Sequence, residues 1–493
     1  MRIDVTGSGR RRVAGTLALA MVALACGPSE PPLPPAPVLE VAAGAGQDAF
    51  ANITLPERLV VRATLAGAPA VGARVSWTVL EGAGTLTADS VTDATGQARG
   101  TYTAGPAAGA YRVAARLVDV PTSAPVTFTG TIGAVVEPPL VATFAVPQTF
   151  GLHDMSVRDG LAFLAAWNAG LMIVDVGDGR KGGSPANPQL VGTALTNAAP
   201  LTTRSVHNAW WFHNPVRNEK RYVFVGQEGP GIVGATSAGD IHVVDVSDMA
   251  NPVEVAFFHL DGAGTHNFWM DEPAQVLYAA YYNGGVVALD VSGVLAGNLA
   301  NRLIANVKAR PDSTYVWSVQ LANGRLYASD MLTGVWQLSP QTLQPVAGGN
   351  NVPDRFGSDF WVHGTHVYSG PWGAAARNGN RGDVAKIWSL GGTGVPTLVD
   401  SVKIAGVQTI SDVEVSADGK LLMLTTERGF GTVGAYFYAL TNPVKPRLVG
   451  RALVAQGVHT GTFARINGRL YAFLATNAPG SGLVVYDVTA LAP

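Results

Sequence analysis

The sequence predicts an all-β protein in which a β-sandwich precedes a β-propeller, and three observations lead to this prediction. Among 493 residues, 59 glycines and 31 prolines against only 14 % charged residues favour short strands and turns over long helices. Residues 38–133 alternate between β-branched strands and glycine turns about every ten residues, as in a sandwich. From residue 140 onward a strand motif recurs at intervals mostly between 45 and 52, close to the period of four-stranded propeller blades.

The first 25 residues have the composition of an export signal and not of a spanning helix. Three arginines (residues 10–12) precede an uncharged apolar run of 13 residues, Val13 to Ala25, whereas a bilayer needs about 20. Cys26, the only cysteine of the chain, follows directly. The segment resembles the lipobox of bacterial lipoproteins, which implies cleavage before Cys26 and acylation of that residue. The alternative is an ordinary secretory signal with an incidental cysteine.

Residues 26–37, which include the run GPSEPPLPPAP, are expected to form a Pro-rich tether. The lipobox resemblance places the protein outside the cytoplasm, anchored by lipid to the bacterial cell envelope. Gly27 in place of aspartate favours the outer membrane by the sorting rule of enterobacterial lipoproteins. Without the first 25 residues the chain has 29 basic and 34 acidic residues and no basic stripe, which argues against nucleic acid as a partner.

The segment 38–133 has the pattern of half-buried strands. Val75, Trp77 and Val79 fall on one face and the polar residues between them on the other. The stretches GQDAFANITLPERLVVRATL and GTLTADSVTDATGQARGTY resemble the bacterial Ig-like domains of invasins and intimins. The resemblance implies a rigid spacer, and no catalytic side chains gather in this segment.

The repeated strand of the second part ends in an acidic or small residue. Aligned on the penultimate position, the seven copies lie 70, 45, 47, 52, 50 and 48 residues apart: Leu171–Val176, Ile241–Val246, Val286–Val291, Val335–Leu338, Ile387–Leu390, Tyr436–Leu440 and Leu483–Val488. The repeat resembles the bacterial LVIVD-repeat family over residues 140–493, which implies a seven-bladed β-propeller. The chain ends five residues after Val488, so the seventh blade lacks an outer strand. We expect residues 140–146, directly after the linker 134–139, to supply it.

A similar dipeptide begins the innermost strand of each unit: His153-Asp154, His207-Asn208, His266-Asn267, Trp317-Ser318, Ser358-Asp359, Ser411-Asp412 and His459-Thr460. These starts are expected on one rim of a central channel, and the hairpins between second and third strands reach the same rim. Convergent polar and aromatic residues are typical of a ligand pocket. The predicted ligand-binding residues are His153, His207, Asn208, Glu228, His266, Asn267, Tyr282, Asp359, Asp412 and His459.

The rim histidines also suggest a divalent metal as a cofactor. His207 and His266 are the candidate ligands, with Asp359 or Asp412 as an oxygen ligand. The alternative is structural, because short polar side chains at a strand entrance readily bond neighbouring backbone. Three tryptophans further along these strands, Trp210, Trp269 and Trp361, are expected to pack between blades. Neither a nucleophile elbow nor a phosphate loop occurs, so the sequence singles out no catalytic residue.

Two functions follow from this organisation. The leading one is a lipid-anchored envelope or cell-surface binding protein, whose propeller rim recognises a carbohydrate, a peptide or a protein. The alternative is a metal-dependent hydrolase or oxidoreductase that uses the rim histidines. The sequence does not decide between a binding protein and an enzyme.

Overall fold

The computed structural model describes residues 35–492 apart from 52, 56, 135, 148–150, 198–204, 230–232, 350–353, 374–378, 393–394, 430, 478–479 and 481. The export signal, Cys26 and most of the tether lie outside the described residues. Within the described ranges the regular elements are strands, with two short 3-10 turns, η1 (Ala300–Arg302) and η2 (Thr489–Leu491). The all-β prediction is therefore confirmed. No helix in that part of the chain is long and apolar enough to cross a membrane.

The N-terminal unit consists of two sheets that share one hydrophobic core. Leu59, Val61 and Tyr102 of the first sheet and Val113 and Phe128 of the second are buried in it. The first sheet has the order β1 (Val38–Ala43), β3 (Leu59–Leu65), β7 (Gln97–Thr103), β6 (Thr85–Ala88), with β4 (Ala68–Pro69) beside β3; the second has the order β2 (Ala49–Phe50), β9 (Val126–Gly133), β8 (Gly109–Leu117), β5 (Val75–Glu81).

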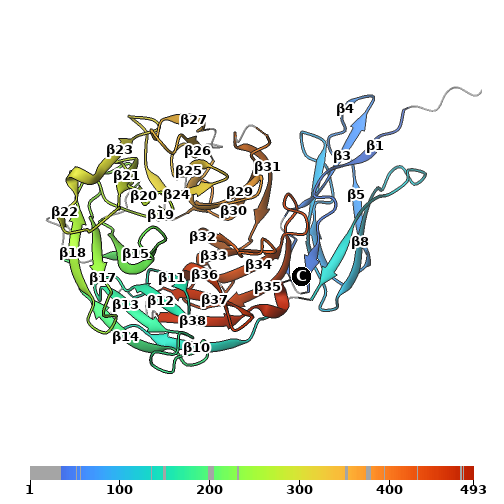
Figure 1. The fold of residues 1–493 in the computed structure, drawn as a ribbon. Coiled ribbons are helices and arrows are strands. Elements are labelled where there is room, and N and C mark those ends of the chain that lie inside the picture. Colours follow the sequence, from blue (N-terminus) through green and yellow to red (C-terminus); the bar gives the residue numbers. More distant parts are fainter. Residues whose placement is uncertain are drawn as a thin grey trace, which may run out of the picture.

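Seven further sheets surround a common centre (Figure 1). In six of them four strands follow one another in the chain: β11 (Asp154–Arg158), β12 (Leu161–Ala165), β13 (Leu171–Asp175), β14 (Gln189–Ala194); β15 (Val206–Asn214), β16 (Glu219–Gln227), β17 (Ile241–Asp245), β18 (Val253–Phe258); β19 (Phe268–Asp271), β20 (Val276–Ala280), β21 (Val286–Asp290), β23 (Leu303–Val307); β24 (Val316–Ala322), β25 (Arg325–Asp330), β26 (Gly334–Leu338), β27 (Pro345–Gly348); β28 (Phe356–His363), β29 (His366–Trp372), β30 (Val384–Ser389), β31 (Thr397–Lys403); and β32 (Val407–Val415), β33 (Leu421–Gly429), β34 (Gly434–Ala439), β35 (Arg447–Leu453). A short strand, β22 (Gly297–Asn298), adds to β18.

The seventh sheet joins the two ends of this part of the chain. It contains β36 (Val458–Ile466), β37 (Arg469–Thr476), β38 (Gly482–Asp487) and, as its outer strand, β10 (Leu140–Ala145). β10 covers six of the residues 140–146 and pairs antiparallel with β38, with Phe144 opposite Leu483. The first strand of each sheet contacts the first strand of the next, and β36 contacts β11. The first strands therefore form a closed ring around the centre.

Burial explains why the middle strands of a sheet are so apolar. Every residue of β12 and β13 is buried, whereas the outer strand β14 mixes exposed, intermediate and buried positions. A sheet that lies between two neighbours has no solvent-facing side at its middle strands, so these strands appear as short continuous apolar runs.

The acidic residue that ends the repeated strand stabilises the turn after it. Asp175, Asp245, Asp290 and Asp487 each accept a hydrogen bond from the backbone N–H two residues further on, at 2.9–3.0 Å. Ser389 uses its hydroxyl oxygen for the same bond at 3.3 Å. Side chains of this type mimic a backbone turn, and this is the physical reason for the recurring aspartate.

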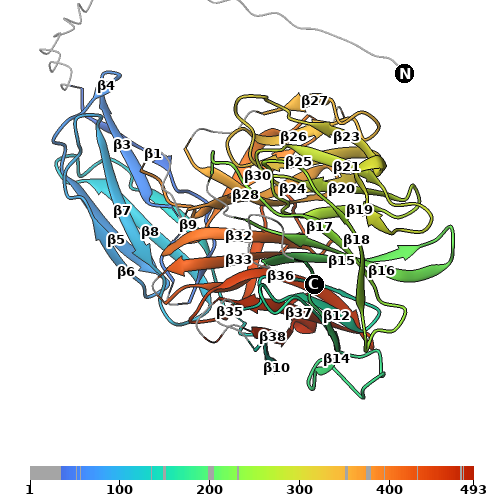
Figure 2. The ribbon, with the colours of Figure 1, turned by 90° about the vertical axis from the view of Figure 1, so that its left-hand side faces the viewer.

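The N-terminal unit lies to one side of the ring, as the blue strands show (Figures 1 and 2). The joint between the two parts makes backbone contacts with the ring. The carbonyl of Val136 accepts a hydrogen bond from Arg451 of β35, and the carbonyl of Pro139 accepts one from Asp487 of β38. The joint is therefore attached to the sixth and seventh sheets.

Candidate functional site

Four histidines lie side by side where the first strands of four consecutive sheets begin. We call His459, His153, His207 and His266, from the seventh, first, second and third sheets, the histidine row. Successive ring centroids are 4.0, 4.3 and 3.9 Å apart. His207 is 1 % and His266 is 2 % exposed. The row is thus a continuous set of nearly buried imidazoles.

Several nitrogens of the row have no hydrogen-bond partner among the described residues. They are both ring nitrogens of His207 and His266 and Nδ1 of His153. The equivalent positions of the fifth and sixth sheets are Ser358 and Ser411, whose hydroxyls donate to main-chain carbonyls of the next first strand at 2.7 and 3.2 Å. Serine therefore satisfies this position structurally, whereas histidine leaves buried polar atoms that cost free energy unless a ligand contacts them.

Glu228 places a carboxylate against the row. Its Oε2 lies 3.8 Å from Nε2 of both His153 and His207, and its Oε1 accepts a hydrogen bond of 2.5 Å from the Tyr282 hydroxyl. A gap of 3.8 Å is about twice the distance of about 2 Å between a zinc ion and a nitrogen or oxygen ligand. Ligand atoms of His207, Glu228 and His266 all lie within 4.8 Å of one another, and the same limit holds for His153, His207 and His459.

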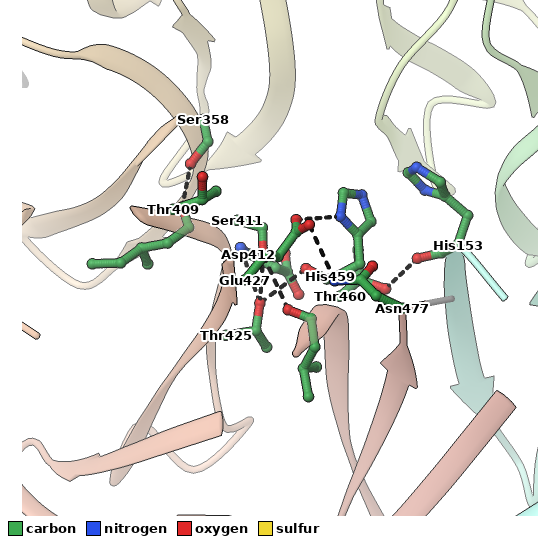
Figure 3. A network of polar contacts seen from close by, with 12 residues as sticks. His153, Ser358, Thr409, Ser411, Asp412, Thr425, Glu427, His459, Thr460 and Asn477 are labelled. Atoms are coloured by element: carbon green, nitrogen blue, oxygen red, sulfur yellow. Dashed lines mark hydrogen bonds and ion pairs between the residues drawn. The ribbon is translucent and has the colours of Figure 1, made fainter. Parts of the chain in front are cut away.

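Glu427 orients the histidine at the end of the row (Figure 3). Its Oε1 lies 2.5 Å from Nδ1 of His459, and its Oε2 accepts a hydrogen bond of 3.1 Å from Asn477. A carboxylate on one ring nitrogen fixes the orientation of a histidine whose other nitrogen binds a metal. The backbone is also held, because Thr425 donates to the carbonyl of His459 at 2.9 Å and Thr460 to that of His153 at 2.8 Å.

Burial sets the charge of the row. It lowers the pKa of His153, His207 and His266 well below the ordinary value, and neighbouring imidazoles lower it further. Burial acts in the same direction on His459, but Glu427 raises the pKa of that residue above its usual value. Three of the four imidazoles are therefore neutral at physiological pH, the form in which histidine binds a metal.

Hairpins between second and third strands bring aromatic rings against the row. Trp167 stacks on His153 at 4.7 Å, and Tyr282 meets the ring of His266 edge-on at 4.9 Å. Both residues have positive φ, 47° and 39°, which is rare for bulky side chains. Each forms reciprocal backbone hydrogen bonds with Val206 or Val316, the residue before the next dipeptide. Strained bulky residues of this kind occur at functional sites.

The second residues of the dipeptides occupy a different place. Asn208, Asn267, Asp359 and Asp412 line a cavity of about 290 Å³ between the first strands, which none of the four histidines lines. Successive side chains of a strand point to opposite faces, so the two members of a dipeptide separate. The predicted set is thus divided into the row with Glu228 and Tyr282, and these four channel residues. The carboxylate near the candidate metal ligands is Glu228, and not Asp359 or Asp412 as the sequence suggested.

Two contributors were not among the predicted ligand-binding residues. Glu427 and Asn477 come from hairpins equivalent to the one that carries Glu228, so hairpin position was the available signal. Trp210, Trp269 and Trp361 pack against the cores between neighbouring sheets, as expected, but they also line the cavity.

Comparison with known proteins adds a family motif. The profile of the LVIVD repeat matches residues 153–196 and 235–259. The chain carries LVIVD repeats. The first match begins at His153 and includes β11 to β14, and the second contains β17 and β18. The WD40 β-propeller domain of Doa1 is similar at 10 % identity, over 72 % of this chain and 98 % of that chain, with a TM-score of 0.49. No curated protein matches the sequence. The ring with its LVIVD repeats is a β-propeller, as the sequence predicted.

Proposed function

We propose that this protein is an envelope-anchored, seven-bladed propeller that binds one divalent first-row transition-metal ion in the histidine row. Two overlapping groups of ligand atoms can hold this ion, His207 with Glu228 and His266 or His207 with His153 and His459, and His207 belongs to both. The observation that carries the proposal is the set of buried ring nitrogens that have no hydrogen-bond partner in the described part of the chain. Imidazole with one carboxylate suits zinc, copper, nickel or iron better than calcium or magnesium.

Burial favours an ion over the glycan or peptide that the sequence put first. A sugar or a peptide needs contact area, whereas His207 and His266 are almost completely covered. An ion needs only the small space between the ligand atoms. A bound ion can act as a Lewis acid or, if it is redox-active, exchange electrons, and this supports the metal-dependent alternative.

The other parts of the proposal concern how the propeller is held relative to the membrane. Acylation of Cys26 would anchor the protein in the envelope, and residues 38–133 would act as an Ig-like stalk. Support for the stalk comes from two sheets with a core of their own. A propeller held away from a membrane on such a stalk is accessible to soluble partners.

Metal analysis tests the proposal. The chain from residue 27 onward, which keeps every described residue, is stripped with a chelator, dialysed against Zn²⁺ or Cu²⁺ and analysed for bound metal. We expect about one ion per chain with the wild type, and loss of that ion in the pair His207→Ala with His266→Ala. The matched control is His363→Ala with His366→Ala, at the turn between β28 and β29. An ion that stays in the first pair, or that leaves in the second, would contradict the assignment.

A further inference from the structure

The central cavity is a second place where a ligand fits, separate from the histidine row. It has a volume of about 290 Å³ and is lined by the first strands of all seven sheets. That volume is about twice the 150 Å³ of an engineered cavity that holds benzene, and it lies at the lower end of small-molecule sites. A compact organic molecule has the right size for it.

The charges of this cavity are strongly unbalanced. Asp154, Asp359, Asp412 and Glu414 all line it. The one basic residue among the described lining residues is Arg158, and its guanidinium forms two hydrogen bonds with Glu272, at 2.5 and 3.1 Å. The acidic groups therefore have no positive partner among the described lining residues, although His459 outside the lining lowers the pKa of Asp154 and of Asp412.

The structural role of these carboxyls does not require their charge. Asp412 accepts a hydrogen bond from the backbone N–H of the next first strand at 2.8 Å, and Glu414 accepts one at 3.1 Å. At the position of β24 equivalent to Glu414, the amide oxygen of Gln320 accepts the same bond at 2.6 Å. An uncharged amide thus joins neighbouring strands equally well. The carboxyls of the cavity call for a further explanation.

Three tryptophans supply an aromatic wall in the same cavity. The ring centroids of Trp210 and Trp269 are 5.5 Å apart and those of Trp269 and Trp361 are 6.1 Å apart. The rings are inclined by 58° and 74°, so they do not cover one another face to face. All three side chains are partly exposed and line the cavity. Tryptophan faces attract organic cations, with an effect that grows when the cation leaves water.

We propose that the cavity binds a small organic cation, with its ammonium group among the carboxyls and its apolar body against the three tryptophans. Geometry favours this class over a bare metal ion, because indole rings are not metal ligands. Charge favours it over a neutral molecule, because the described lining holds four acidic groups and, as its one basic residue, Arg158, which is paired with Glu272. Burial raises the pKa of Glu414 to about 8 and, together with the neighbouring Asp412, raises the pKa of Asp359 well above its usual value.

Calorimetric titration of the chain from residue 27 onward tests this proposal. The probes are choline, phenethylamine and 3,3-dimethylbutan-1-ol, a neutral molecule with the shape of choline. We expect choline or phenethylamine to bind with a Kd below about 1 mM, and the neutral alcohol to bind at least about tenfold more weakly. Failure of both cations to bind, or equal binding of the alcohol, would overturn the proposal.

Substitutions in the cavity and in the histidine row test where the cation binds. Glu414→Gln keeps the hydrogen bond to the next strand, and Trp269→Leu removes one aromatic face. Each substitution should lower the affinity for the cation by about tenfold. The pair His207→Ala with His266→Ala should leave the cation affinity unchanged, since these histidines do not line the cavity. Loss of cation binding in the histidine pair, with an unchanged melting temperature, would overturn the placement. Competition by Ca²⁺ at equal concentration would show a metal site instead.

Discussion

Glutamine in place of Glu414 should stabilise the folded protein at alkaline pH and leave its stability nearly unchanged at acid pH. Burial raises the pKa of Glu414 from 4.5 to about 8, although the hydrogen bond from Phe463 opposes the change and Asp412 reinforces it. Below pH 4.5 the carboxyl is protonated in both the folded and the unfolded chain and contributes nothing to the pH dependence. Between pH 4.5 and 8 only the unfolded chain ionises, so the free energy of unfolding falls as the pH rises.

The size of the effect follows from the two pKa values. The full difference between 4.5 and about 8 corresponds to about 5 kcal/mol. Glu414 keeps some contact with the cavity, and water there reduces the penalty. We therefore expect Glu414→Gln to raise the free energy of unfolding by about 2 kcal/mol at pH 8.5 relative to pH 4. The equivalent position of β24 already contains an amide, Gln320, so the strand pairing should tolerate the change.

Urea unfolding followed by tryptophan fluorescence at pH 4, 6 and 8.5 measures this effect. The matched variant is Gln320→Glu, which introduces a carboxyl at the equivalent position and should destabilise the protein increasingly as the pH rises. The reasoning would be refuted if the difference in free energy of unfolding between wild type and Glu414→Gln did not change with pH. It would also be refuted if Glu414→Gln were least stable, relative to wild type, at pH 8.5.

Three further predictions concern the anchor, the ring and the histidine row. Cys26→Ser should release the protein from membranes, and a variant that still sediments with salt-washed membranes would disprove lipid anchoring. Deletion of residues 140–146 should lower the melting temperature by about 5 °C or more, because it leaves the edge of β38 unpaired. Deletion of residues 38–133 should lower the melting temperature less. Equal decreases in the two variants would contradict closure of the ring by residues 140–146. Glu427→Gln should weaken Zn²⁺ binding by about tenfold or more at an unchanged melting temperature, and an unaltered zinc affinity would show that Glu427 does not position His459.

The repeat located the elements of the ring, because burial between neighbouring sheets imposes the same apolar pattern on each unit. The predicted strand Leu171–Val176 is β13, and the segment 140–146 contains β10. The predicted first domain, 38–133, runs from the start of β1 to the end of β9. Strands of this kind can be predicted from the sequence because apolar residues occupy the buried positions and polar residues the exposed ones.

The site was less readable because it depends on side-chain direction across several sheets. The dipeptides lie at or near the strand starts, except for Ser411-Asp412, which lie in the middle of β32. They could not tell that His207 faces the row while Asn208 lines the cavity. The carboxylate at the row comes from Glu228, whose backbone N–H donates to the carbonyl of Ser205, two residues before His207. Asp359 and Asp412 line the cavity instead. Glu427 acts through His459, a contact between residues 32 apart that no local pattern records.

The closure of the ring has a mechanical consequence. β10 is continuous with the joint at Val136 and Pro139, so a pull on the N-terminal unit reaches the propeller through this joint and through the strand that holds its two ends together. Such a load meets the bond between Val136 and Arg451 first and then the β10–β38 hydrogen bonds. The backbone bonds from the joint to Arg451 and Asp487 share that load between the sixth and seventh sheets. Tension would therefore open the ring at its seam and leave the sheets that carry His207 and His266 until last.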